Sequence, residues 1–286
     1  MSAAKTYYGL TKPGIIYGNL LSTGAGFFVA SQQHIHILLL AETLAGIALV
    51  IGSACVFNNY IDRDIDKAMA RTKRRALASG RVSARNAMAY ATVLGVTGFL
   101  ILGVFTNLLT VAVGLFGFVD YVVLYGIAKR RSVHGTLVGS LSGSAPIVAG
   151  YTAATGRLDG GALLLFLILT FWQMPHFYAI ALRRLADYKA ANIPVLPAVK
   201  GPRAAKFQIV LYVAAFALAA GLLFAYGYTG YVYLVCLGLY AAGWLALGLR
   251  GFKASDDKQW ATRMFLYSLV MLPLLFASTL LDAWLH

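Results

Sequence analysis

The polar run from Asn58 to Asp66, NNYIDRDID, has the spacing of a metal-binding helix end. On a helix, Asn58, Asp62 and Asp66 follow one another at intervals of four residues, so their side chains share one face, and Asp64 points the other way. Two carboxylates on one face repel each other and need a positive partner. Oxygen ligands of this kind suit Mg²⁺, which binds one or two carboxylates together with substrate phosphates.

A basic loop follows directly and reads RTKRR from Arg71 to Arg75. Guanidinium groups bind phosphate oxygens through two parallel hydrogen bonds. Taken separately, the carboxylates are explained by a solvated helix end, and the basic residues by the positive charge that orients membrane proteins. Their adjacency favours a metal–diphosphate site, because orienting charge does not explain the carboxylates.

Other polar groups lie in or beside long apolar runs. Tyr125 and Lys129 stand four residues apart, with Arg130 following, and by themselves they read as a helix end with basic side chains reaching the membrane surface. His176 lies within an apolar run, where an ionisable group is a functional candidate, although a hydrogen bond across helices explains it equally well. Asp120 and Glu42 also lie in apolar runs and receive no role.

The composition shows what must position these groups. Of the 286 residues, 60% are hydrophobic and only 12% are charged, against about 25% charged residues in soluble domains. The mean hydropathy is +0.73. These values exclude a soluble enzyme, a secreted disulfide scaffold and a disordered chain. The net charge of +14 first indicates nucleic acid, but the charges lie in short gaps between apolar runs, so no nucleic-acid partner is expected. Cys55 and Cys236 show no metal spacing.

The apolar runs predict an all-α, polytopic membrane protein, because a transmembrane helix needs about 20 apolar residues. The nine predicted spans are residues 14–31, 37–57, 87–105, 108–127, 136–153, 161–181, 207–226, 231–249 and 264–284. The first and fifth are the weakest, and the small residues of the fifth predict an interior helix. With these spans, 23 of the 24 Lys and Arg residues fall on one side and only Arg157 on the other. The N-terminus should therefore be cytoplasmic and the C-terminus external.

These motifs resemble those of the UbiA-type intramembrane prenyltransferases. The first family signature corresponds to Asn58, Asp62, Arg63, Asp66, Arg71, Thr72, Arg75, Ser79 and Gly80, and the helix 4 signature to Tyr125, Lys129 and Arg130. Asp187, with Asn192 after it, resembles a weakened second acidic motif. Residues 55–66, 135–143 and 172–197 resemble the branch that uses heme as acceptor, and the likeness extends from Thr11 to about Trp260.

The resemblance implies one intramembrane domain over residues 1–286, with nine helices around a central cavity in the bacterial inner membrane. Its reaction would transfer farnesyl from farnesyl diphosphate to a vinyl group of heme B, with Mg²⁺, giving heme O. A downstream heme A synthase or terminal oxidase is the further partner that it implies. The implied catalytic residues are Asn58, Asp62, Asp66, Tyr125 and Lys129. The implied diphosphate ligands are Arg63, Arg71, Arg75, Lys129, Arg130 and Lys200. The implied metal ligands are Asn58, Asp62, Asp66 and Asp187, and His176 is the expected heme contact.

Three other functions compete with this one. Within the same fold, the acceptor would be an aromatic quinone precursor. A cation-coupled transporter also carries intramembrane acids and broken helices, but usually at the membrane midplane. Here six of the ten acidic residues lie at the predicted inner face. A non-catalytic oxidase subunit or heme-binding membrane protein is the third alternative.

Overall fold

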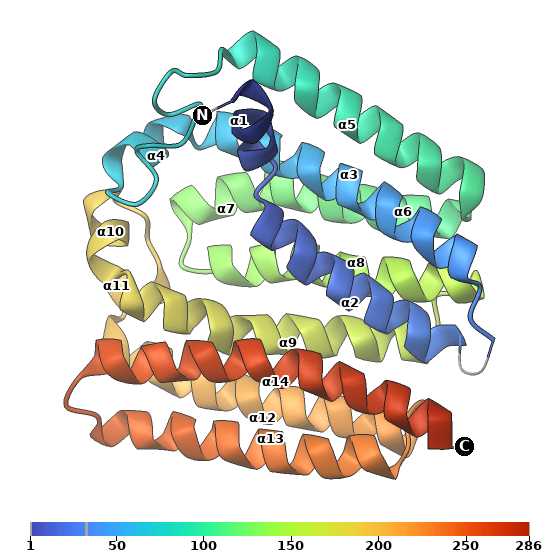
Figure 1. Ribbon diagram of the computed structural model, residues 1–286. Coiled ribbons are helices and arrows are strands. Elements are labelled where there is room, and N and C mark those ends of the chain that lie inside the picture. The colour runs from blue at the N-terminus through green and yellow to red at the C-terminus, as the bar shows by residue number, and fades with distance from the viewer. Residues whose placement is uncertain (1, 32–33, 286) are drawn as a thin grey trace.

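The computed structural model describes residues 2–31 and 34–285, and in these residues every regular element is a helix (Figure 1). The α-helices are α1 (Ala3–Leu10), α2 (Pro13–Ser31), α3 (Ile37–Ile61), α4 (Arg63–Ala68), α5 (Ala84–Phe105), α6 (Leu108–Val119), α7 (Tyr125–Arg131), α8 (Gly135–Thr155), α9 (Gly160–Arg183), α10 (Leu185–Ala190), α11 (Leu196–Val199), α12 (Gly201–Ala225), α13 (Tyr231–Arg250) and α14 (Asp257–Leu285). A π-helical turn, η1 (Asp120–Leu124), joins α6 to α7, and a 3₁₀ turn, η2 (Gly251–Lys253), follows α13.

Seven of the described helical stretches are long and apolar enough to cross a membrane. They are Ile37–Ile61, Ala84–Phe105, Leu108–Arg131, Gly160–Arg183, Gly201–Ala225, Tyr231–Lys253 and Asp257–Asp282. The all-α membrane class is thereby confirmed. The number of nine spans is not confirmed, because α2 and α8, the two spans expected to be weakest, are absent from this set. Both helices are rich in Gly, Ser and Thr, which lowers their hydropathy.

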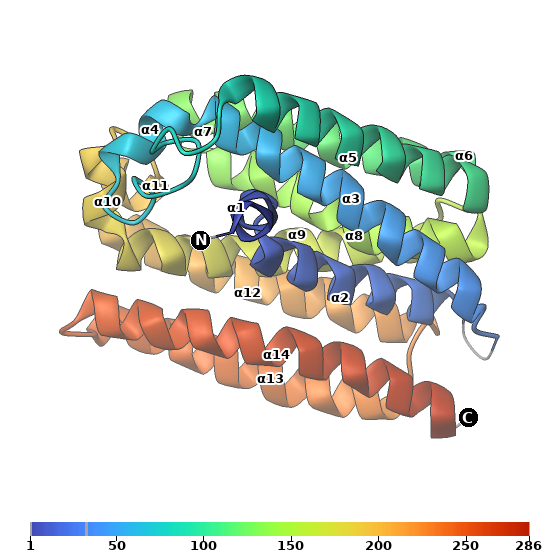
Figure 2. The same cartoon turned by 45° about the horizontal axis from the view of Figure 1, so that its top comes forward.

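The long helices run side by side in a bundle (Figures 1 and 2). Helix α9 lies in the interior and packs against α8, α12 and α14, while α2 packs on α8 and α3 on α5. Outward-facing apolar side chains such as Val104, Leu218 and Leu239 are exposed. This is the pattern expected when lipid rather than water surrounds the bundle, because exposed apolar side chains then cost little.

Helix α8 is an interior helix, as its small residues predicted, and most of its second half is buried. A Cβ atom added to Gly150 would lie 1.9 Å from the carbonyl oxygen of Thr23 in α2, and one added to Gly26 would lie 1.9 Å from the carbonyl oxygen of Ile147. Each glycine therefore allows a backbone approach between α2 and α8 that no larger residue permits.

The short elements α1, α4, α7, α10 and α11 gather at one end of the bundle, which we call the α4 end (Figure 1). The segment after α4 and the segment that holds α10 and α11 correspond to the two long basic loops of the sequence. The fold thus places the acidic and basic motifs at one mouth of the bundle.

Candidate active site

The acidic motif lies where α3 passes into α4. Helix α3 ends at Ile61, and Asp62 occupies the break with its N–H still bonded to the Asn58 carbonyl at 2.9 Å. The Asp66 N–H is bonded to the Asp62 carbonyl at 2.8 Å, so the four-residue spacing persists through the break. Asn58, Asp62 and Asp66 are buried, while the Asp64 side chain is 69% exposed. The predicted shared face, with Asp64 turned away, is therefore present.

Each member of this face has a positive partner. Lys129 Nζ lies 2.6 Å from Asp62 Oδ2, and Lys12 Nζ donates to Asn58 Oδ1 at 2.7 Å. Arg75 Nη1 lies 2.8 and 2.9 Å from the two carboxylate oxygens of Asp66. These contacts provide the positive charge that two neighbouring carboxylates require.

The basic loop returns to the acidic motif through a local hydrogen bond. The Thr72 hydroxyl donates to the Asp66 carbonyl at 3.0 Å, and the Thr72 N–H donates to the Met69 carbonyl. Because Thr72 is buried, this turn fixes the path of the loop and returns Arg75 to Asp66. The basic loop therefore packs against the acidic motif at the end of α3.

A cavity of about 770 Å³ opens beside these pairs. Its basic lining residues are Lys12, Arg71, Arg75, Lys129, Arg183 and Arg184. The buried acids Asp62 and Asp66 are not themselves part of the lining. The cations therefore lie between the carboxylates and the cavity, which makes its mouth attractive to an anion.

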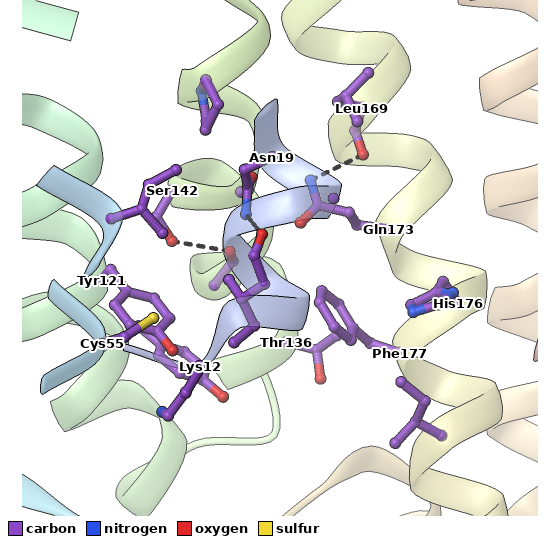
Figure 3. A pocket seen from close by; sticks show the side chains of 18 of the residues that line it. Lys12, Asn19, Cys55, Tyr121, Thr136, Ser142, Leu169, Gln173, His176 and Phe177 are labelled. Atoms are coloured by element: carbon purple, nitrogen blue, oxygen red, sulfur yellow. Dashed lines mark hydrogen bonds between the residues drawn. The ribbon is translucent and has the colours of Figure 1, made fainter. Parts of the chain in front are cut away.

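The cavity continues from Lys12, Cys55 and Tyr121 across to Gln173, His176 and Phe177 on α9 (Figure 3). Much of this inner part is apolar or aromatic. Tyr121 and Tyr125 stack at 5.6 Å on one wall, and Trp172, Phe177 and Phe265 form part of another. One cavity therefore joins a cationic mouth to a chamber with aromatic walls.

Lys12 was not singled out by the sequence motifs. It lies in the turn between α1 and α2 with a φ of 53°, and its amine reaches both Asn58 and the face of the Tyr121 ring. The pKa of Lys12 is lowered to about 8, mainly because the amine is buried. Its position depends on the packing of α1 against α3, which a local sequence pattern does not contain.

Of the other predicted residues, Arg71, Tyr125 and His176 line the cavity, whereas four do not. Arg63 lies over the Tyr60 ring at 4.4 Å. Arg130 Nη2 lies 3.5 Å from Asp62 Oδ1, but Arg130 is not part of the cavity lining. Lys200 lies on a separate groove with Arg203, Phe207 and Phe252. Asp187 lies in α10 and is not part of the lining, although its neighbour Tyr188 is. The structure thus does not assemble the four as cavity ligands.

Asp120 and Glu42, two acidic residues within apolar runs, are not part of the lining either. Asp120 starts the π turn and is buried, and its Oδ2 accepts the Ser142 N–H at 3.1 Å. This contact ties the π turn to α8, which supports a structural role.

A match to a family model covers residues 19–270, and the model describes the UbiA prenyltransferase family. The chain belongs to this family. It is therefore a prenyltransferase, and it is a multi-pass membrane protein with the α-helical fold of the UbiA family. A relative from Klebsiella pneumoniae named protoheme IX farnesyltransferase is 53% identical over 267 residues, which cover 93% of this chain and 90% of the relative.

Solved structures share this UbiA fold at low sequence identity. A digeranylgeranylglyceryl phosphate synthase superposes with a TM-score of 0.82 at 16% identity and covers 99% of both chains. A UbiA homologue from Archaeoglobus fulgidus bound to GPP and Mg²⁺ superposes with a TM-score of 0.69 at 15% identity, covering 96% of this chain and 99% of that one. These similarities concern the fold.

The donor set at the α3–α4 break fits a hard divalent cation. Asn58, Asp62 and Asp66 contribute oxygen atoms, and the buried Asp62 Oδ1 has no hydrogen-bond partner among the described residues. Within residues 2–31 and 34–285, no three His, Cys, Asp or Glu side chains lie close enough together to hold a metal ion. Asp187 therefore does not complete such a cluster with Asp62 and Asp66. Two carboxylates are nevertheless sufficient for Mg²⁺ when substrate phosphates complete the ligand shell.

Proposed function

We propose that this UbiA prenyltransferase transfers the farnesyl group of farnesyl diphosphate to a vinyl group of heme B and forms heme O. The observation that carries the proposal is the single cavity with two chemically different halves, a cationic mouth and an aromatic chamber that contains His176. The name of the relative that is 53% identical supports this donor and this acceptor.

In this proposal the mouth holds the diphosphate. Lys12, Arg71, Arg75 and Lys129 provide charged donors for its oxygens. Asn58, Asp62 and Asp66 would hold Mg²⁺, as the GPP- and Mg²⁺-bound structure of the Archaeoglobus fulgidus homologue supports. When bound, Mg²⁺ neutralises charge on the diphosphate and makes it a better leaving group.

The aromatic chamber holds the prenyl chain and the porphyrin. The C1–O bond of farnesyl diphosphate breaks, and the vinyl group attacks the resulting allylic cation. Water then adds to the new cation on the heme side chain and loses a proton, which gives the hydroxyethyl group. The chamber walls formed by Tyr121, Tyr125 and Phe177 keep other water from the allylic cation. His176 is the proposed heme contact.

The mouth faces the cytoplasm in this proposal, because nearly all Lys and Arg residues lie in connections at that side. The N-terminus is then cytoplasmic, the C-terminus is external, and the membrane is the bacterial inner membrane. Residues 1–286 act as one domain. The product would be consumed by a heme A synthase or a terminal oxidase.

The test is a reaction of the purified protein in lipid nanodiscs with heme B, farnesyl diphosphate and Mg²⁺, analysed by mass spectrometry. We expect heme O with Mg²⁺ and none with a chelator. Asp62→Ala is the inactive control. If the protein prenylates 4-hydroxybenzoate and leaves heme B unchanged, the acceptor is an aromatic quinone precursor and the proposal is wrong.

A further inference from the structure

The ring of His176 is held from three sides within the cavity. Trp172 stacks on it at 4.9 Å with an interplanar angle of 22°, and Phe265 of α14 lies at 4.9 Å. Phe177 meets it edge-on at 5.3 Å. The side chain of Trp172 also donates from Nε1 to the Ser268 carbonyl at 3.2 Å, which fixes α9 against α14 at this point. The orientation of the imidazole is therefore set by packing.

The hydrogen bonds of Ser268 determine which nitrogen of His176 carries the proton. Ser268 Oγ lies 2.7 Å from the Phe265 carbonyl oxygen and 2.8 Å from His176 Nδ1. A carbonyl oxygen only accepts, so the single hydroxyl hydrogen of Ser268 must point to Phe265. Ser268 Oγ then accepts, and Nδ1 is the N–H donor of the pair.

The other nitrogen, Nε2, then carries a lone pair. No residue within the described ranges forms a hydrogen bond to it, and it is not among the buried atoms that lack a partner, so it opens to the cavity that His176 lines. Among the same residues, no carboxylate lies within ion-pair distance of His176 to stabilise a second proton. Nε2 therefore presents a lone pair to the cavity. It can bind a metal, but it has no hydrogen to donate to a carboxylate.

A cation suited to a carboxylate lies elsewhere in the same cavity. Arg183 follows His176 by seven residues, on the same face of α9, and its guanidinium lies 4.5 Å over the Phe265 ring. No acidic partner for Arg183 occurs in the described part of the chain. A propionate group of the acceptor therefore has a better partner than His176.

We propose that Ser268 is a positioning residue that holds His176 in the Nδ1–H tautomer, so that Nε2 coordinates the iron of the porphyrin acceptor. This inference rests on the proposed function. A hydrogen bond to the non-coordinating nitrogen fixes the tautomer and the ring orientation, and loss of such a partner typically weakens metal binding about 10–100-fold.

The test compares two ligands that differ only in the metal, ferric heme B and metal-free protoporphyrin IX, without farnesyl diphosphate. The variants are His176→Ala, His176→Gly, Ser268→Ala and Ser278→Ala. Ser278 is the matched control, because it is also buried in α14 and bonds the carbonyl three residues earlier, at 2.6 Å, but forms no hydrogen bond to a histidine among the described residues. Affinity is measured by Soret titration in nanodiscs.

We expect His176→Ala and Ser268→Ala to weaken heme B binding at least about 10-fold, while metal-free protoporphyrin binding changes less than about 3-fold. Ser278→Ala should change neither. His176→Gly should regain the wild-type heme spectrum with added imidazole, which shows that the variant is folded. Unchanged heme binding by His176→Ala or by Ser268→Ala, or equal loss of both porphyrins, would overturn the inference even where wild-type protein makes heme O. Failure of the wild type to make heme O would instead overturn the proposed function.

Discussion

Lys129 and Asp62, 67 residues apart in the chain, form an ion pair of 2.6 Å that separates the buried carboxylate from the cavity. Lys129 lines the cavity, whereas Asp62 does not. Arg75 has the same relation to Asp66. If these carboxylates bind Mg²⁺ as proposed, Lys129 and Arg75 must turn toward the cavity, where a diphosphate would offer them new partners. Metal and diphosphate should bind together, each favouring the other.

Replacing Lys129 with Met tests two effects of this lysine separately, its effect on Mg²⁺ binding and its effect on diphosphate binding. The variant leaves Asp62 without its nearest cation, and an unpaired buried carboxylate costs about 3–5 kcal/mol of unfolding free energy. We expect Lys129→Met to unfold at a lower temperature than the wild type, and Mg²⁺ alone to raise its unfolding temperature more than it raises that of the wild type. Farnesyl diphosphate should bind about 10–100-fold more weakly, because one charge-assisted hydrogen bond is lost.

Thermal unfolding in detergent and isothermal titration check both expectations. Lys258→Met is the matched control, because Lys258 lies in the first turn of α14 and is not part of the cavity lining. If Mg²⁺ stabilises Lys129→Met and wild type equally, Lys129 does not cover the metal site.

The acidic stripe predicts unequal effects of three neighbouring substitutions. Asp62→Asn and Asp66→Asn each remove a buried carboxylate and should lower kcat at least about 100-fold. Asp64→Asn should retain most activity, because its side chain is exposed and, among the described residues, pairs with Lys67 alone, at 3.5 Å. Turnover of the three variants at saturating Mg²⁺ checks this. Equal loss at all three positions would place Asp64 in the reaction.

The sequence predicted the long helices and the acidic stripe because both depend on local pattern. Hydropathy marks a span, and the four-residue spacing keeps Asn58, Asp62 and Asp66 together even though the helix breaks at Asp62. The sequence did not predict contacts between distant segments. His176 and Ser268 are 92 residues apart, and the Lys12–Asn58 contact joins a turn to a helix 46 residues away.

Lys200 is a residue that the sequence assigned to the site but that the structure places elsewhere. Its position in a basic loop predicted a diphosphate ligand, but α11 and the turn at Gly201, with a φ of 82°, carry the chain to a separate groove. The path of that loop depends on packing against α12, since α11 contacts α12, and residue type alone does not determine it.

The orientation predicted from the Lys and Arg distribution has a direct test. Reporters fused after Arg81 or Arg184 should be cytoplasmic, and reporters fused after Gly156 or at the C-terminus should be external. Alkaline phosphatase and green fluorescent protein fusions give opposite signals on the two sides. A cytoplasmic C-terminus would require an even number of spans and would contradict the nine-span topology.

The crossing of α2 and α8 predicts a large effect of one added methyl group. Gly150→Ala would place its Cβ 1.9 Å from the Thr23 carbonyl oxygen, so the helices must separate. Overpacking of this kind costs about 1–3 kcal/mol. Gly238→Ala in α13 is the matched control, because no described atom lies within 4 Å of its added Cβ. Alanine forms helix better than glycine by about 1 kcal/mol, so the control should be neutral or stabilising.

Thermal unfolding of both variants in one detergent measures the difference, and the separation of α2 from α8 should also affect the site. Helix α2 follows directly on Lys12, and α8 contributes Gly139 and Ser142 to the cavity lining. We therefore expect Gly150→Ala to raise the KM for farnesyl diphosphate as well as to lower the unfolding temperature, whereas Gly238→Ala changes neither. Equal unfolding temperatures for the two variants would mean that α2 and α8 do not approach each other at this crossing.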